Sequence, residues 1–112
     1  MQYFVYDPNF KPEEAKLPTP EQYAAMGQFV MEAAQAGVLV TTGGLQAKGM
    51  RLELNNSKVT VTDGPFIELK ELLGGFAVLR ANTVEEVIEW CTRFRNIIGD
   101  GVSEIVPIFG AE

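Results

Sequence analysis

Two helix-start signatures constrain the fold of this chain more than any other feature. Residues 19–22 (TPEQ) and 83–86 (TVEE) each place a threonine three residues before a glutamine or glutamate. This is the pattern of a capping box, in which the two side chains satisfy free backbone N–H groups of the first helical turn. The first signature predicts a helix over 20–36 that ends at Gly37, and the second predicts a helix from residue 84.

Apolar side chains recur at helical spacing after both signatures, so each helix is expected to bury one face. The first stripe comprises Tyr23, Met26, Val30 and Ala33, widened by Ala25 and Phe29, and the second comprises Val84, Val87, Ile88, Cys91 and Phe94. An apolar environment raises the pKa of a thiol, so Cys91 is expected to be an inert packing residue.

Short runs rich in β-branched and aromatic residues flank both helices and predict strands. These runs are 1–6, 38–40, 76–79 and 102–109. Between the two halves, apolar and polar residues alternate over 50–54 and 59–62 around an Asn-Asn-Ser turn, which predicts a half-exposed hairpin. Residues 67–73 have the composition of a short helix.

Strand, helix, strand, occurring twice with a hairpin inserted between, predicts an α+β fold of the ferredoxin-like, split βαβ class. The length of 112 residues fits one domain. Because the strands are apolar on both faces and the two long helices can cover only one, we expect a second copy to cover the other face. The expected assembly is a homodimer with a barrel-like core. The alternative is that the inserted hairpin folds across the open face of its own chain.

Composition excludes several classes of function. A formal net charge of −6 provides no field that would gather nucleic acid or anionic lipid. The chain has no histidine, which removes imidazole bases and histidine-bearing zinc sites, and its single cysteine cannot form an internal disulfide. We expect neither a metal nor a cofactor. No apolar run is long enough to span a membrane, and the N-terminus lacks a signal-peptide pattern, so a cytoplasmic location is expected.

The motif of residues 61–66 (VTDGPF), followed by Lys70-Glu71 and by 73–76 (LGGF), resembles the YCII-related family, in particular its DGPF-domain branch. The resemblance implies a ferredoxin-like fold, a dimeric α+β barrel and a bacterial, cytoplasmic protein. It also implies an association with sigma factors of the extracytoplasmic-function type, which some members of the branch adjoin. A histidine–aspartate pair discussed for the wider family cannot be carried over, because this chain has no histidine.

Asp63 is the candidate catalytic residue, because a carboxylate at a strand end lies where loops gather around a cleft. Its alternative role is to accept backbone N–H groups of the turn that follows. The candidate ligand-binding residues are Gly64, Pro65, Phe66, Lys70 and Arg80. For these, structural roles remain open: the glycine and proline can shape the turn, Phe66 can be core, Lys70 can form a surface ion pair, and Arg80 can meet a partner subunit.

Three functions are compatible with these residues. The first is a dimeric module that binds or senses a small molecule in a cleft between sheet and helices. The second is an enzyme that uses Asp63 for acid–base catalysis on a small, rather apolar substrate. The third is a purely structural dimer. The sequence favours the binding module, because it offers no histidine, no nucleophile beside an evident base and no cofactor fingerprint.

Overall fold

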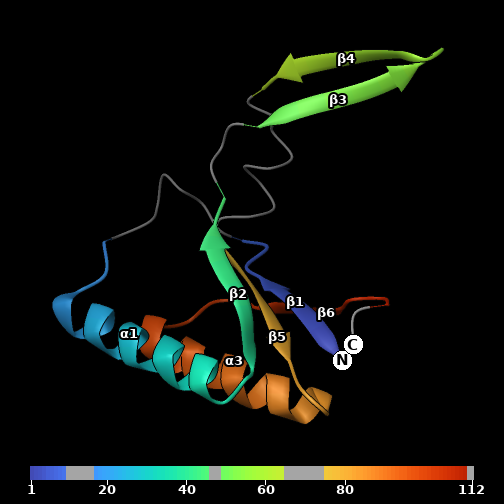
Figure 1. Cartoon of the computed structure of the whole chain (residues 1–112). Coiled ribbons are helices and arrows are strands. Elements are labelled where there is room, and N and C mark those ends of the chain that lie inside the picture. The colour runs from blue at the N-terminus through green and yellow to red at the C-terminus, as the bar shows by residue number, and fades with distance from the viewer. Residues whose placement is uncertain (10–16, 46–48, 65–74, 111–112) are drawn as a thin grey trace.

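The computed structural model describes residues 1–9, 17–45, 49–64 and 75–110 of the chain (Figure 1). Its strands are β1 (Gln2–Tyr6), β2 (Leu39–Gly44), β3 (Met50–Asn55), β4 (Lys58–Asp63), β5 (Gly75–Arg80) and β6 (Glu104–Pro107). Its helices are α1 (Pro20–Gln35) and α3 (Val84–Ile98). The short helix predicted over 67–73 lies outside the described residues.

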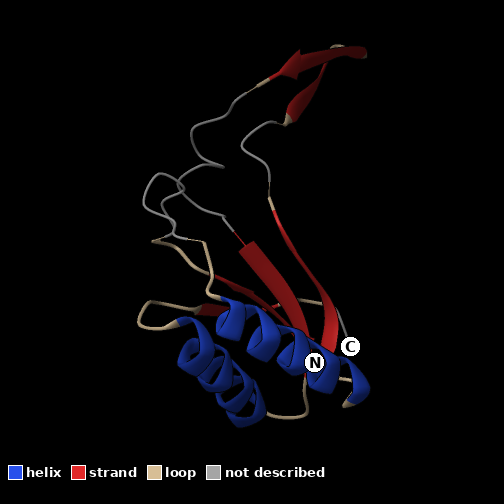
Figure 2. Cartoon of the chain, turned by 90° about the vertical axis from the view of Figure 1, so that its left-hand side faces the viewer, coloured by secondary structure: helices blue, strands red, loops and turns tan. Residues whose placement is uncertain are grey.

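Four strands form one antiparallel sheet in the order β2-β5-β1-β6, and both helices cover the same face of it (Figure 2). The strands on either side of α1 are not neighbours, because β5 pairs between β1 and β2. This is the split βαβ arrangement. The predicted ferredoxin-like α+β fold is therefore confirmed.

The N-terminus of α1 forms as predicted. The Thr19 hydroxyl accepts a hydrogen bond from the Gln22 backbone N–H at 3.1 Å, and the Gln22 side chain accepts one from the Thr19 N–H at 3.0 Å. Gly37 follows the helix with a φ of 74°, a left-handed conformation that glycine adopts without a steric penalty. These contacts explain why α1 begins and ends where the sequence indicates.

At the start of α3 only half of the predicted capping box forms. The Thr83 hydroxyl accepts from the Glu86 N–H at 3.3 Å. The Glu86 carboxylate, however, accepts from the backbone N–H of Asn82, also at 3.3 Å, and not from that of Thr83. The Thr83 hydroxyl therefore still satisfies one free backbone N–H of the first helical turn. The Glu86 carboxylate instead satisfies the N–H of Asn82, the residue that precedes the cap.

The buried faces of the helices differ in part from the predicted stripes. Tyr23, Val84 and Ile88 are exposed, at 63%, 42% and 50%. The inward face of α3 is centred on Val87 and Cys91, which are both buried. Each residue turns the helix by about 100°, so Ile88 points well away from Val87. The predicted stripe was too wide because apolar residues that flank a buried row need not be buried themselves.

The predicted hairpin of β3 and β4 forms, and its turn residues Asn56 and Ser57 both have positive φ angles, of 51° and 66°. Positive φ at both central positions defines the tight turn that matches strand twist. The expectation of half-exposure is wrong, because every residue of both strands is exposed. The alternative that this hairpin covers the open sheet face is also wrong, because it projects beyond the end of β2 (Figure 1). We call β3 and β4 the arm.

The sheet face opposite the helices carries an aromatic and aliphatic patch, of which Val106 is exposed and Phe4, Phe76 and Val78 are half-buried. Phe4 lies opposite both Val78 and Val106, and residues directly opposite each other share a face. The rings of Phe4 and Phe76 stack with centroids 5.8 Å apart. We call Phe4, Phe76, Val78 and Val106 the open face.

Candidate functional site

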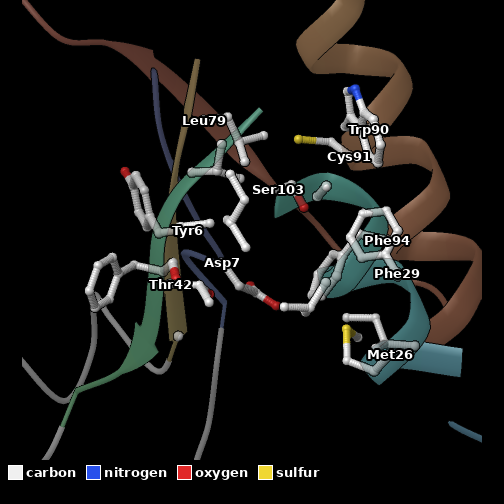
Figure 3. A pocket seen from close by; sticks show the side chains of 18 of the residues that line it. Tyr6, Asp7, Met26, Phe29, Thr42, Leu79, Trp90, Cys91, Phe94 and Ser103 are labelled. Carbon is white, nitrogen blue, oxygen red and sulfur yellow. The ribbon is translucent and has the colours of Figure 1, made fainter. Parts of the chain in front are cut away.

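A cavity of about 440 Å³ lies between the helix-covered face of the sheet and the two helices (Figure 3). Its floor is the sheet, where Leu39, Ala77 and Leu79 point toward the helices. Met26 and Val30 of α1 form part of the opposite wall. The small side chain of Ala77 leaves space between this part of the sheet and the helices.

Three aromatic side chains join α1 to α3 along one wall of the cavity (Figure 3). The ring centroid of Phe29 lies 5.7 Å from that of Trp90 and 6.4 Å from that of Phe94. Such tilted arrangements are the favoured geometry of aromatic pairs. The wall is therefore apolar and held in place by contacts between the two helices.

The guanidinium of Arg93 packs against two rings of this aromatic wall. Its guanidinium carbon lies 4.6 Å from the centroid of Trp90 and 5.3 Å from that of Phe29. The same group forms an ion pair with Glu32 of α1. The hydrogen bond from Arg93, together with its charge, lowers the pKa of the Glu32 carboxyl below its ordinary value. Arg93 thus connects the helices by a charge and by ring contacts at once.

The polar lining of the cavity is concentrated around Arg95 of α3. The Nε of Arg95 donates to the Ser103 hydroxyl at 2.9 Å, and a terminal nitrogen donates to the Asp7 carboxylate at 3.2 Å. The same nitrogen donates to the backbone carbonyl of Val102. The other Asp7 oxygen accepts from the Asn9 N–H at 2.8 Å. We call Asp7, Arg95 and Ser103 the polar cluster.

These contacts define what the cavity can do chemically. Ser103 accepts from a guanidinium, which is a donor and cannot act as a base toward the hydroxyl. Cys91 also lines the cavity, but burial raises the pKa of its thiol, against a smaller opposing effect of Arg95. No cluster of metal-ligating side chains occurs within the described ranges. The arrangement supports recognition of an apolar molecule that has one polar end.

Comparison with protein families agrees with this architecture. The model of the YCII-related domain matches residues 1–111 of the chain. The chain belongs to the YCII-related family. No curated protein matches this YCII-related sequence. In the described part of the domain, neither helix has the length and apolar character needed to cross a membrane.

The structure describes three of the predicted site residues of this YCII-related domain, Asp63, Gly64 and Arg80, and none of the three lines the cavity. Asp63 ends β4, is exposed and lies opposite Met50 at the base of the arm. Gly64 donates its backbone N–H to the Gly49 carbonyl at 2.9 Å and so closes that base. Arg80 lies at the end of β5 that is farther from the arm (Figure 1), and its side chain is also exposed.

Asp63 and Gly64 are thus together, while Arg80 is at a separate place on the YCII-related fold. Three other candidate residues lie outside the described residues: Pro65, Phe66 and Lys70. The roles predicted for all of these residues stay predictions.

Sequence reasoning missed the three members of the polar cluster. One signal was available, because Arg95 follows Val87 and Cys91 at intervals of four and therefore continues the buried face of the helix. A cation in such a row indicates a polar partner inside the fold. For Asp7 the signal was weaker, since an Asp before a proline also marks a strand end. Ser103 has no local signal.

Proposed function

We propose that this domain binds a small, mostly apolar, uncharged molecule in the cavity between sheet and helices. The observation that carries the proposal is the combination of mainly apolar walls with the polar cluster at one end of the cavity. Ligand sites of proteins have volumes of roughly 300–1,000 Å³ and combine apolar walls with a few convergent polar groups. The cavity, at about 440 Å³, falls within that range.

The polar cluster indicates the chemistry of the bound molecule. The charge of Asp7 is balanced by Arg95, so an uncharged ligand group is favoured over an ion. Ser103 accepts from Arg95, which leaves its own hydroxyl proton to donate. A carboxylate has about four acceptor sites, so Asp7 can accept from a ligand as well. A hydroxyl, amide or neutral amine group, which both donates and accepts, fits this cluster.

We further assign the chain to the DGPF branch of its family, on the motif of residues 61–66 and the glycine pair that follows it. This assignment supports a regulatory role in a bacterial sigma-factor pathway, in which the bound molecule would be the signal. A domain whose cavity lacks an activated nucleophile among the described side chains suits sensing better than turnover.

Acid–base catalysis through Asp63 is the alternative function. Its carboxylate lies at the exposed base of the arm and does not line the cavity. A substrate bound in the cavity would therefore not contact it. Binding that is unchanged in Asp63→Asn agrees with the binding proposal.

Dye binding tests the proposed function. N-phenyl-1-naphthylamine is an uncharged, mostly apolar dye that carries one N–H and fluoresces strongly in apolar sites. We expect it to bind the wild-type chain. Ala77 lies on the cavity floor, so Ala77→Phe fills the space and should weaken binding at least about tenfold. The melting temperature of the variant establishes that it is folded.

Ala24 provides the matched control, because it is exposed on α1 and outside the cavity. Ala24→Phe adds the same ring and should leave the affinity for the dye unchanged. Equal dye affinity in a folded Ala77→Phe variant and in the wild type would show that the dye binds elsewhere and would contradict the proposal.

A further inference from the structure

Two hollow spaces of the fold meet at the polar cluster. Besides the cavity between sheet and helices, a groove of about 250 Å³ lies between α3 and β6. Cys91, Arg95 and Ser103 line both the cavity and the groove. Side chains that line two neighbouring spaces form the wall between them. The end of the cavity at the polar cluster is therefore closed by these three side chains.

The periodicity of α3 explains why the wall stands there. Cys91 and Arg95 are four residues apart and lie on the inward row of the helix. The neighbouring row, Ile88, Thr92 and Asn96, lines the groove. Of the two wall residues on the helix, Arg95 has the longer side chain, and its Nε reaches across to the Ser103 hydroxyl. Arg95 is therefore the residue that spans the wall.

The groove is more polar than the cavity. The Thr92 hydroxyl donates to the Ile88 carbonyl at 2.7 Å and can still accept a hydrogen bond from a ligand. The exposed Asn96 amide can both donate and accept. Among the described residues that line the groove, Arg95 alone carries a charge. The groove would suit an uncharged group with several hydroxyls or amides, if such a group could reach it from the cavity.

Gly101 makes room for the guanidinium in this wall. A Cβ atom at residue 101 would lie 2.3 Å from the Nη1 of Arg95 and 3.0 Å from its Cζ, whereas ordinary contact begins at 3.4 Å. The guanidinium is the end of a flexible side chain, so it would move and the backbone would not. N–H···O hydrogen bonds form over a range of only about 2.7–3.2 Å, so a shift of this size disrupts the bonds that hold Arg95.

We propose that Arg95 is a specificity-determining residue, which closes the cavity against the groove and restricts the bound molecule to one with a small polar end. A single hydroxyl, amide or neutral amine fits, and a larger polar group does not. Gly101 is the positioning residue that allows Arg95 to close the wall. This inference rests on the proposed binding function and adds the size of the ligand's polar end to it.

Two compounds with the same eight-carbon chain test the size limit by displacing N-phenyl-1-naphthylamine. Octan-1-ol has a single hydroxyl, whereas octyl-β-glucoside carries a sugar. We expect octan-1-ol to displace the dye from the wild type at a concentration at least about tenfold lower than octyl-β-glucoside. In Gly101→Ala the wall is open, so the ratio of the two concentrations should fall at least about fivefold.

Gly27→Ala is the matched control. It makes the same substitution at an exposed glycine where a Cβ atom has no heavy atom within 4 Å, so it should keep the wild-type ratio. The φ of Gly101 is not positive, so alanine at that position is not subject to left-handed strain. Melting temperatures establish that both variants are folded.

Two further measurements distinguish positioning of Arg95 from a general loss of stability. The Nε–H of Arg95, followed by NMR, should exchange with water at least about tenfold faster in Gly101→Ala, because it loses its hydrogen bond to Ser103. In Arg95→Met, which has no guanidinium to displace, adding Gly101→Ala should leave the ratio unchanged. If Arg95→Met fails to fold, the exchange rate decides, since it is measured without that variant.

An unchanged ratio in folded Gly101→Ala, or an Nε–H exchange rate equal to that of the wild type, would overturn the proposal. A Gly101→Ala variant that does not fold would overturn it as well, because the backbone and not Arg95 would then have yielded. Failure of the dye to bind the wild type would instead contradict the proposed function, and the exchange rate would still decide whether Gly101 positions Arg95.

Discussion

The guanidinium of Arg95 donates a hydrogen bond to the carboxylate of Asp7 across 3.2 Å, although the two residues lie 88 positions apart in the sequence. This contact joins the end of β1 to the last turn of α3 at one end of the cavity. It places a balanced pair of charges beside the mainly apolar lining of the cavity.

Arg95→Met should therefore destabilise the fold. The substitution leaves Asp7 partly buried without its cation and removes the donor to Ser103, which together should cost about 1–3 kcal/mol. Arg93→Met is the comparison, because the Arg93–Glu32 pair is more exposed and its charges are screened by water, so its loss should lower the unfolding free energy by less than the loss of Arg95 does. Urea unfolding measures both. Equal losses in the two variants would argue against a structural role for the polar cluster.

The Arg93–Glu32 pair should make stability depend on pH in acid. Arg93 lowers the pKa of Glu32 in the folded chain below its ordinary value of 4.5. The ionised carboxylate therefore stabilises the fold above pH 4.5, and this contribution disappears as the pH falls through the folded-state pKa.

We expect the difference in unfolding free energy between wild type and Glu32→Gln to shrink on acidification. In Arg93→Gln, the pKa of Glu32, followed by NMR, should rise. A Glu32 pKa that is the same in the wild type and in Arg93→Gln would show that Arg93 is not what lowers it.

The Cys91 thiol should react slowly in the native protein. It is 8% exposed, and burial raises its pKa, so little thiolate forms at neutral pH. Since the folded-state pKa is the higher one, the neutral thiol stabilises the fold below its ordinary pKa of 9.0, and this contribution is lost as the pH rises through the folded-state value. Denaturation should accelerate labelling by a thiol reagent at least about a hundredfold.

Because Cys91 lines the cavity, bound N-phenyl-1-naphthylamine should slow native labelling further. Labelling that is as fast in the native as in the denatured chain would show that α3 opens readily. Cys91→Ser should cost about 1–3 kcal/mol by burying a hydroxyl, whereas Cys91→Ala should lose mainly packing.

The sequence was sufficient for the elements whose causes are local. The Thr19 cap, the left-handed Gly37 and the Asn56–Ser57 turn each depend on neighbours within a few residues, and each forms as predicted. The order of strands and helices along the chain then predicted the split βαβ arrangement of the sheet. The width of a buried stripe is less predictable, as Val84 and Ile88 show, because it depends on how far a helix sits from the surface it covers.

The candidate site could not be found in the same way. Asp7, Arg95 and Ser103 meet only after the sheet and α3 are assembled, so no local pattern relates them. The cavity is lined by side chains of the sheet, of α1 and of α3, so its volume depends on how these elements pack together. Asp63 belongs to a motif that is conspicuous in the sequence, but its side chain lies on the arm and not at the cavity.

The location of the bound dye tests the central claim most directly. NMR cross-relaxation between N-phenyl-1-naphthylamine and protein methyl groups identifies the residues that surround it. We predict contacts to the methyl groups of Val30, Ala77 and Leu79, which line the cavity. Contacts confined to Leu52, Val59 and Val61 would place the dye on the arm and contradict the account.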